Sequence, residues 1–107
     1  MKYALQIKPL SVNAAYRGRR FATPELSKYK RDVMLLLPRI RVPTGKLGVK
    51  YTFGISKATD GENCIKAFTD ILSEKYGFND NIIYRWEVEK VVVKKGEEFI
   101  NFEIVSL

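Results

Sequence analysis

Residues 46–56 alternate without interruption between two kinds of side chain. Every second residue is large and apolar, and the residues between are lysine, glycine, threonine or serine. Successive side chains of a strand point to opposite faces, so this pattern predicts a strand with one buried face. The apolar members are Leu47, Val49, Tyr51, Phe53 and Ile55.

Two helices are predicted, one on either side of this strand in the sequence. Thr23 and Pro24 form an N-cap followed by proline at the first helical position, and the apolar stripe that follows ends at Pro38. A second helix is predicted from near Gly61 to Gly77, because glycine favours the backbone conformation that ends helices. Its apolar face consists of Cys64, Ile65, Phe68, Ile71, Leu72 and Tyr76.

Other segments rich in β-forming residues predict strands at 1–8, 82–93 and 100–104. Residues 94–97 are expected to turn the chain between the last two strands, and residues 16–21 to form a loop. The predicted order is β-α-β-α-β-β. We therefore expect residues 1–107 to form a single α+β domain with a mixed sheet and a C-terminal hairpin.

The composition excludes several kinds of chemistry. The 107 residues contain no histidine and one cysteine, which excludes Ser-His-Asp and Cys-His catalysis and zinc sites built from these ligands. Any hydrolytic site must use carboxylates, lysine, hydroxyls and a metal that prefers oxygen. The lone cysteine is typical of a reducing cytoplasm, where we expect the protein. No segment resembles a signal peptide or a membrane span.

The net charge of +7 is unevenly distributed along the chain. Residues 1–59 contain thirteen Lys and Arg against two acids, whereas residues 60–107 contain six against ten. A basic first half indicates a polyanionic partner such as a nucleic acid. The alternative is a basic protein that is merely soluble or associated with the ribosome.

Acidic residues gather where the strand 46–56 gives way to the second helix. Asp60 and Glu62 are followed by Asn63 and Lys66, and Asp80 returns in the turn after the helix. A structural interpretation is available: Asp60 caps the helix, Glu62, Lys66 and Asp70 form an i, i+4 charge ladder, and Asp80 is a turn residue. On these residues alone it is the simpler interpretation, although it leaves Asn63 unexplained.

The functional interpretation makes this cluster a metal site. Carboxylate oxygens of Asp60, Glu62 and Asp80 suit Mg²⁺, with Mn²⁺ as an alternative. Lys66 would orient the attacking water or stabilise negative charge on a scissile phosphate. No organic cofactor is expected.

The spaced motifs resemble the RusA family of Holliday junction resolvases. That family carries Asp-x-Asp-Asn-x-x-Lys, a later aspartate and then Asp-Asp-x-x-Ile/Val, preceded by a Pro-x-Ser-x-Asn-x-x-Tyr entry. The similar residues here are Pro9, Ser11, Asn13 and Tyr16, then Asp60, Glu62, Asn63, Lys66 and Asp70, and finally Asn79, Asp80, Ile83 and Lys90. The resemblance covers most of the chain, with residues 32–48 the least defined.

The resemblance implies a homodimeric, Mg²⁺-dependent endonuclease that makes paired nicks in four-way DNA junctions during recombination and repair. Its essential residues would be Asp60, Glu62, Asp80 and Lys66, supported by Asn63, Asp70 and Lys90. Two positions depart from the family pattern: Glu62 replaces an aspartate, and Asn79 replaces the first acid of the Asp-Asp pair.

Basic and aromatic residues of the first half are candidates for contacts with DNA. They are Asn13, Tyr16, Arg17, Arg19, Arg20, Lys28, Lys30, Arg31 and Lys57. The alternative is that Tyr29 lies in the core and the neighbouring charges only solvate a helix. Trp86 is expected in the core or in a dimer contact.

Two other functions stay open at this stage. One is a catalytically weak or silent module of the same fold that binds branched DNA or RNA. The other is a nuclease for flaps, forks or RNA in place of four-way junctions.

Overall fold

The computed structural model describes residues 2–11, 16–17, 21–56 and 64–107, with the backbone alone described at 16–17 and 21–22. Strands β1 (Tyr3–Leu5), β2 (Tyr16–Arg17) and β3 (Phe21–Ala22) precede helix α2 (Pro24–Leu36). Strand β4 (Leu47–Ile55) and helix α3 (Ile65–Tyr76) follow. The 3₁₀ turn η2 (Asp80–Ile82) then leads into β5 (Ile83–Val92) and β6 (Phe99–Ser106).

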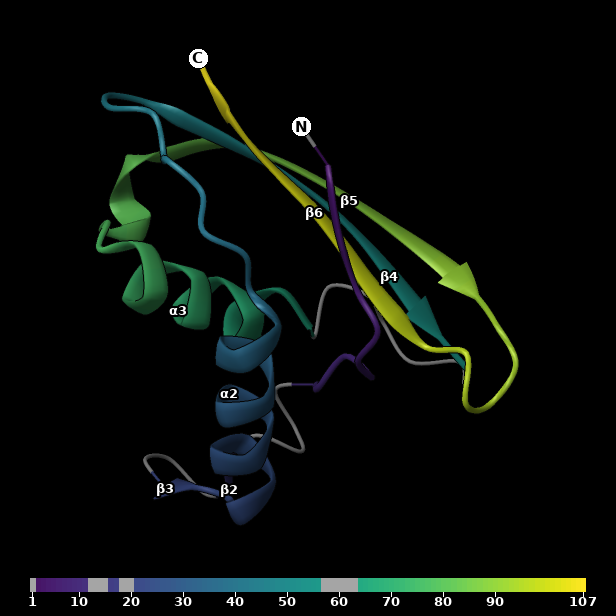
Figure 1. Ribbon diagram of the computed structural model, residues 1–107. Coiled ribbons are helices and arrows are strands. Elements are labelled where there is room, and N and C mark those ends of the chain that lie inside the picture. The colour runs from purple at the N-terminus through teal and green to yellow at the C-terminus, as the bar shows by residue number, and fades with distance from the viewer. Residues whose placement is uncertain (1, 12–15, 18–20, 57–63) are drawn as a thin grey trace.

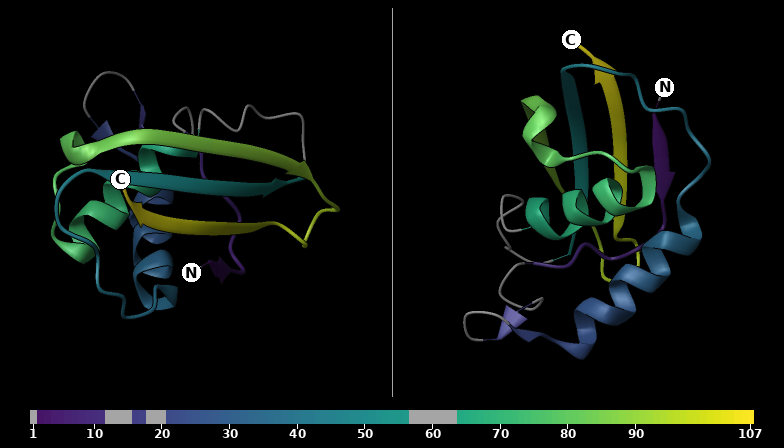
Figure 2. Two further views of the ribbon diagram at one scale, coloured as in Figure 1. Left: turned by 90° about the horizontal axis from the view of Figure 1, so that it is seen from above. Right: turned by 90° about the vertical axis from the view of Figure 1, so that its left-hand side faces the viewer.

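Four strands form one mixed sheet in the order β1-β6-β4-β5, confirming the expected α+β class (Figure 1). Strand β4 pairs in parallel with β5 and antiparallel with β6, whose other edge pairs with β1. Helix α3 is therefore the crossover of a β-α-β unit. Figure 2 shows α3 against the sheet and α2 extending beyond it toward the short β2–β3 pair.

The predicted C-terminal hairpin is wrong, because β4 lies between β5 and β6. Strand β4 is mostly buried, so backbone groups left unpaired at either of its edges would be costly, and β6 and β5 pair with one edge each. At Gly54 the ring of Phe99 packs so closely that a Cβ would lie 2.3 Å from it. The absence of a side chain at Gly54 thus lets β6 pair with β4.

The segment 16–21, predicted as a loop, is only partly irregular. Tyr16 pairs with Ala22 and Arg17 with Phe21, giving the two-residue strands β2 and β3. This small ribbon is separate from the main sheet and precedes α2. Arg17, one of the residues expected to contact DNA, is therefore carried by a short β-ribbon.

The core lies between one face of the sheet and α3. The ring of Phe68 meets those of Tyr51, Phe53 and Phe102 nearly edge-on, at centroid distances of 5.1, 6.3 and 5.6 Å. The Tyr51 hydroxyl lies 2.8 Å from the Thr69 hydroxyl, which satisfies both buried groups. Burial raises the pKa of Tyr51. Apolar side chains of α2 and of the connecting segments complete this core.

The helix ends follow the sequence signals. The Thr23 hydroxyl accepts a hydrogen bond from the Leu26 backbone N–H, and Pro24 is the first residue of α2, as predicted. Gly77 ends α3 with a φ of 70°, also as predicted. The expected start of that helix near Gly61 lies outside the described residues, and α3 is observed from Ile65.

The opposite face of the sheet is polar and solvated. Lys50 lies between Glu87 of β5 and Glu103 of β6, so charges of opposite sign alternate across three strands. Over the described ranges, neither helix is both long enough and apolar enough to cross a membrane.

Candidate active site

The acid-rich segment at the centre of the sequence prediction falls largely outside the described residues. Asp60, Glu62, Asn63 and Lys57 all lie in the range 57–63, which the structure does not describe. Its two flanking residues are placed: Ser56 directly follows β4, and Cys64 directly precedes α3. Both line the same cavity.

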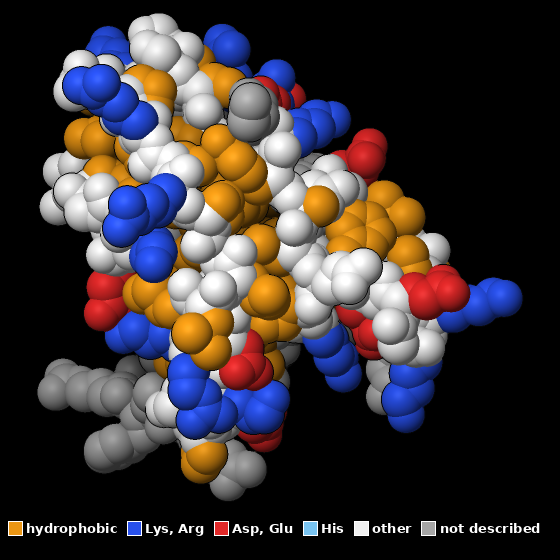
Figure 3. All heavy atoms as spheres, viewed as in Figure 1, with side chains coloured by type: hydrophobic (Ala, Val, Ile, Leu, Met, Phe, Trp, Pro, Cys, Tyr) orange, Lys and Arg blue, Asp and Glu red, His pale blue; other side chains and the backbone are white. Residues whose placement is uncertain are grey.

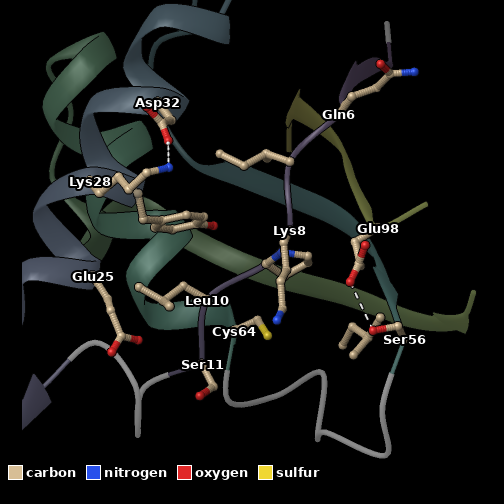
Figure 4. A pocket seen from close by; sticks show the side chains of 14 residues that line it. Gln6, Lys8, Leu10, Ser11, Glu25, Lys28, Asp32, Ser56, Cys64 and Glu98 are labelled. Carbon is tan, nitrogen blue, oxygen red and sulfur yellow. Dashed lines mark hydrogen bonds and ion pairs between the residues drawn. The ribbon is translucent and has the colours of Figure 1, made fainter. Parts of the chain in front are cut away.

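This cavity has a volume of about 630 Å³ and lies where five parts of the chain meet (Figure 4). The segment after β1 forms one wall and α2 another. The end of β4, Cys64 just before α3 and Glu98 just before β6 line the remainder. Its charged lining residues are Lys8, Glu25, Lys28, Asp32 and Glu98. A cavity lined by both signs of charge can accept a group that carries donors and acceptors.

Glu98 is fixed firmly in this wall. Its carboxylate accepts hydrogen bonds from the Ser56 hydroxyl at 3.0 Å and from the Gly96 backbone N–H at 2.7 Å. Hydrogen bonding from its own backbone N–H, and from Ser56, lowers the pKa of Glu98. Glu98 therefore remains an anion near the point where the acid-rich segment begins.

Cys64 is not a nucleophile. Its side chain is 1% exposed, and burial raises the pKa of the thiol to about 11. The thiol stays protonated at neutral pH, and the expectation that Cys64 acts as a small buried apolar residue is confirmed.

Lys66 and Asp70 form an exposed ion pair on α3, with Nζ and Oδ2 3.4 Å apart. Phe68 and Leu72 are buried on the opposite face of the helix. The predicted arrangement of charges on one helical face is thus confirmed for the two residues that are described. Lys66 therefore places a positive charge where an anion could approach α3 from solvent.

Asp80 lies at the other end of α3 from Cys64. It is exposed, begins η2, and shares a shallow hollow with Asp70 and Glu74. The Asn79 side chain accepts a hydrogen bond from the Asn81 backbone N–H at 3.1 Å, as expected of turn residues. Asp80 and Asp70 therefore line the same hollow.

The pairing of β4 with β5 determines how Asp80 lies relative to the end of β4. Leu47 pairs with Ile83 and Ile55 with Val92, so the strands that flank the site are neighbours but run in parallel. Asp80, just before β5, is at the Leu47 end of the sheet, whereas Ser56 is at the Ile55 end. At roughly 3.3 Å per residue these ends are about 26 Å apart.

No group of three or more Cys, Asp or Glu side chains that could hold a metal ion occurs in the part of the chain that the structure describes. Of the predicted ligands, only Asp80 belongs to that part. Asp60 and Glu62 lie outside it. Asp70, expected as a supporting residue, is the carboxylate that shares the hollow with Asp80.

The basic residues of α2 are exposed but bind carboxylates. Lys28 Nζ lies 2.9 Å from Asp32 Oδ2, and Lys30 Nζ lies 2.6 Å from Glu74 Oε2. Arg31 makes a longer contact with Asp32. Exposed pairs of this kind are weak, so phosphates can displace the carboxylates. Tyr29 is buried, which confirms the alternative that placed this residue in the core.

The other residues expected to contact DNA are less completely described. Asn13, Arg19 and Arg20 lie outside the described residues, and Tyr16 and Arg17 are described by the backbone pairing of β2. Figure 3 shows Lys and Arg side chains over much of one face, with Asp and Glu between them.

Sequence reasoning missed the cavity residues Ser56, Glu98 and Glu25. Forty-two positions separate Ser56 from Glu98, and the pairing of β6 with β4 brings them together. No local spacing signals this contact, because it depends on the strand order. A scan against models of known protein families finds no match to the chain, and a search of curated proteins finds no similar sequence.

Proposed function

We propose that the protein is a Mg²⁺-dependent endonuclease that cuts four-way DNA junctions with paired, symmetric nicks. The observation that carries the proposal is the exposed Lys66–Asp70 ion pair on α3, together with the shallow hollow that Asp70 lines with Asp80. These residues occur in the order and spacing of the resolvase motif. A cation and carboxylates on an open surface suit a phosphodiester backbone approached through a divalent metal.

The chemistry of the donor set fits magnesium. Asp80 is an exposed carboxylate, a hard oxygen ligand of the kind that Mg²⁺ prefers. Asp60 and Glu62 are the further carboxylates of the motif, and the end of β4 that precedes them lies at the other end of the sheet from Asp80 in the same copy. Mg²⁺ held by Asp80 would lower the pKa of a coordinated water and neutralise charge on the phosphate. Lys66 stabilises negative charge that develops on the phosphate oxygens. Asp70 positions Lys66 through their ion pair.

Binding is assigned to the basic residues around the β2–β3 ribbon and α2. Their phosphate contacts would orient the junction without reading its sequence, because phosphates are the same at every step. Junction geometry, and not base identity, would then select the substrate. Paired nicks in a two-fold junction require two equivalent sites, so the active form is a dimer.

The arginines in and beside the β2–β3 ribbon are expected to contribute measurably to binding of the DNA junction. Replacing Arg17, Arg19 and Arg20 with alanine is expected to reduce the slope of log K against log salt by up to about three units, since each phosphate contact contributes roughly 0.9. Binding titrations of a four-way junction over a range of salt measure this slope. Lys94→Ala with Lys95→Ala serves as the control. An unchanged slope in the triple variant would remove the ribbon from the interface.

Cleavage itself tests the proposal. The protein is incubated with a synthetic four-way junction, a fork, a plain duplex and a structured RNA, each with Mg²⁺, Mn²⁺ or EDTA. We expect symmetric nicks in the junction with Mg²⁺ and none with EDTA. Tight binding without cleavage in either metal would indicate a binding module instead. Preferential cutting of forks or RNA would support a nuclease activity but contradict the four-way junction as its substrate.

A further inference from the structure

Strand β5 is a long edge strand with an apolar surface. Within the described residues it pairs only with β4, so its other edge carries backbone groups that a further strand could pair with. Tyr84, Trp86 and Val88 are 63%, 43% and 38% exposed. Trp86 pairs with Val49 and Val88 with Tyr51, so both lie on the helix side of the sheet, beyond the area that α3 covers. Of the two positions expected for Trp86, the core or a dimer contact, its exposure excludes the core.

The other face of β5 carries charges of both signs. Arg85 pairs with Gly48 and Glu87 with Lys50, on the polar side of the sheet, and both side chains are exposed. When two copies of such a strand pair antiparallel, the positive residue of each copy can lie opposite the negative residue of the other. This complementarity points to a second copy of the chain as the occupant of the edge.

We propose that two copies dimerise by antiparallel pairing of their β5 edges, with Trp86 on the two-fold axis. The surface consists of Tyr84, Arg85, Trp86, Glu87 and Val88. The dimer is part of the function proposed above, but its surface is inferred from β5 alone.

Charge selects this register among the alternatives. A two-fold axis perpendicular to the sheet keeps each side chain on its own face. Residues opposite each other must therefore share a face, which requires that one residue of β5 lies opposite its own copy, at the axis. An axis at Arg85 sets the two Arg85 side chains opposite each other, and an axis at Val88 sets Glu87 opposite the partner's Glu89 twice, which is unfavourable. An axis at Glu87 pairs Arg85 with the partner's Glu89 twice but also sets the two Glu87 side chains opposite each other. An axis at Trp86 places Arg85 opposite the partner's Glu87, twice.

The same register brings exposed apolar side chains together. The two Trp86 side chains meet at the centre, each beside Val88 of its own strand on the same face, and aromatic and β-branched side chains stabilise each other across strands. Because the two strands run antiparallel, the start of β5 in one copy adjoins the end of β5 in the other. Asp80 of each copy then lies at the same end of the joint eight-stranded sheet as the end of its partner's β4.

Charge reversal tests the pairing. Sedimentation velocity and light scattering should show a dimer for the unmodified protein. Arg85→Glu or Glu87→Arg alone should weaken it at least about tenfold in Kd, because two attractive pairs become repulsive. The double variant Arg85→Glu with Glu87→Arg should restore it. Glu89→Arg, which lies outside the Arg85–Glu87 pairs, is the control. A monomeric unmodified protein, or a dimer that neither single reversal weakens, would overturn the proposal.

Crosslinking tests the register directly. Residues on the axis have Cβ atoms about 4.5–5.5 Å apart, close enough for a disulfide after a small adjustment. Trp86→Cys should therefore give a disulfide-linked dimer with oxidised glutathione, whereas Glu89→Cys should not. The native Cys64 is buried and does not interfere. Crosslinking through Glu87→Cys in place of Trp86→Cys would overturn the register. A dimer that cuts no junction would contradict the nuclease and leave this interface intact.

Discussion

Replacing Phe68 with alanine is expected to lower the free energy of unfolding by about 3–5 kcal/mol. The side chain is fully buried and packs against Tyr51, Phe53 and Phe102, so its loss leaves a cavity that three rings cannot fill without moving. A domain of this size has roughly 5–15 kcal/mol of stability in total. The melting temperature should therefore fall by roughly 12 °C or more.

Urea unfolding followed by circular dichroism measures this effect at a fixed protein concentration. Leu35→Ala on α2 is the matched control, because Leu35 is 79% exposed and its truncation should change stability by less than about 0.5 kcal/mol. If Phe68→Ala destabilised the protein no more than Leu35→Ala, α3 would not pack on β4 as described.

Local patterns in the sequence predicted most of the individual elements. The alternation of residues 46–56 gave β4 within one residue at each end. Thr23, Pro24 and Gly77 marked helix ends correctly, because capping and glycine conformation depend on neighbours in the chain. These signals are local, so they can be recognised without knowing the fold.

The strand order was not predictable in the same way. Residues 94–97 have the composition of a hairpin turn, and nothing near them shows that β6 passes to the far edge of β4. The pairing of β6 with β4 depends on contacts between residues far apart in the sequence, such as Phe99 with Gly54 and Phe102 with Phe68. A turn signal predicts a change of direction and does not identify the strand that pairs next.

In the candidate site too, local features were predictable from the sequence and features that depend on the strand order were not. The helical spacing of Lys66 and Asp70 was enough to place them on one exposed face of α3. The position of Asp80 relative to the end of β4 depends on whether β4 and β5 run parallel, and the sequence left that open. Their parallel pairing places Asp80 at the other end of the sheet from Ser56, where it lines a hollow together with Asp70.

Replacing Asp80 with asparagine is expected to reduce junction cleavage at least about 100-fold, because a ligand of the proposed metal is lost. Binding of the junction should be unchanged or slightly tighter, since one negative charge is removed from a surface that approaches phosphates. Asp80 is exposed, so the variant should keep its fold. Asp60→Asn should show the same separation of cleavage from binding.

Two further variants make this result specific to the site. Glu103→Gln removes a carboxylate from the polar face of the sheet, away from α3, and should leave the cleavage rate unchanged. Asp70→Asn should reduce the rate less than Asp80→Asn, because Asp70 acts through Lys66. Rates measured over a range of Mg²⁺ distinguish the two roles: loss of a ligand raises the Mg²⁺ concentration needed for half-maximal cleavage, whereas loss of a positioning residue lowers the maximal rate. Cleavage by Asp80→Asn at the unmodified rate would show that Asp80 holds no metal.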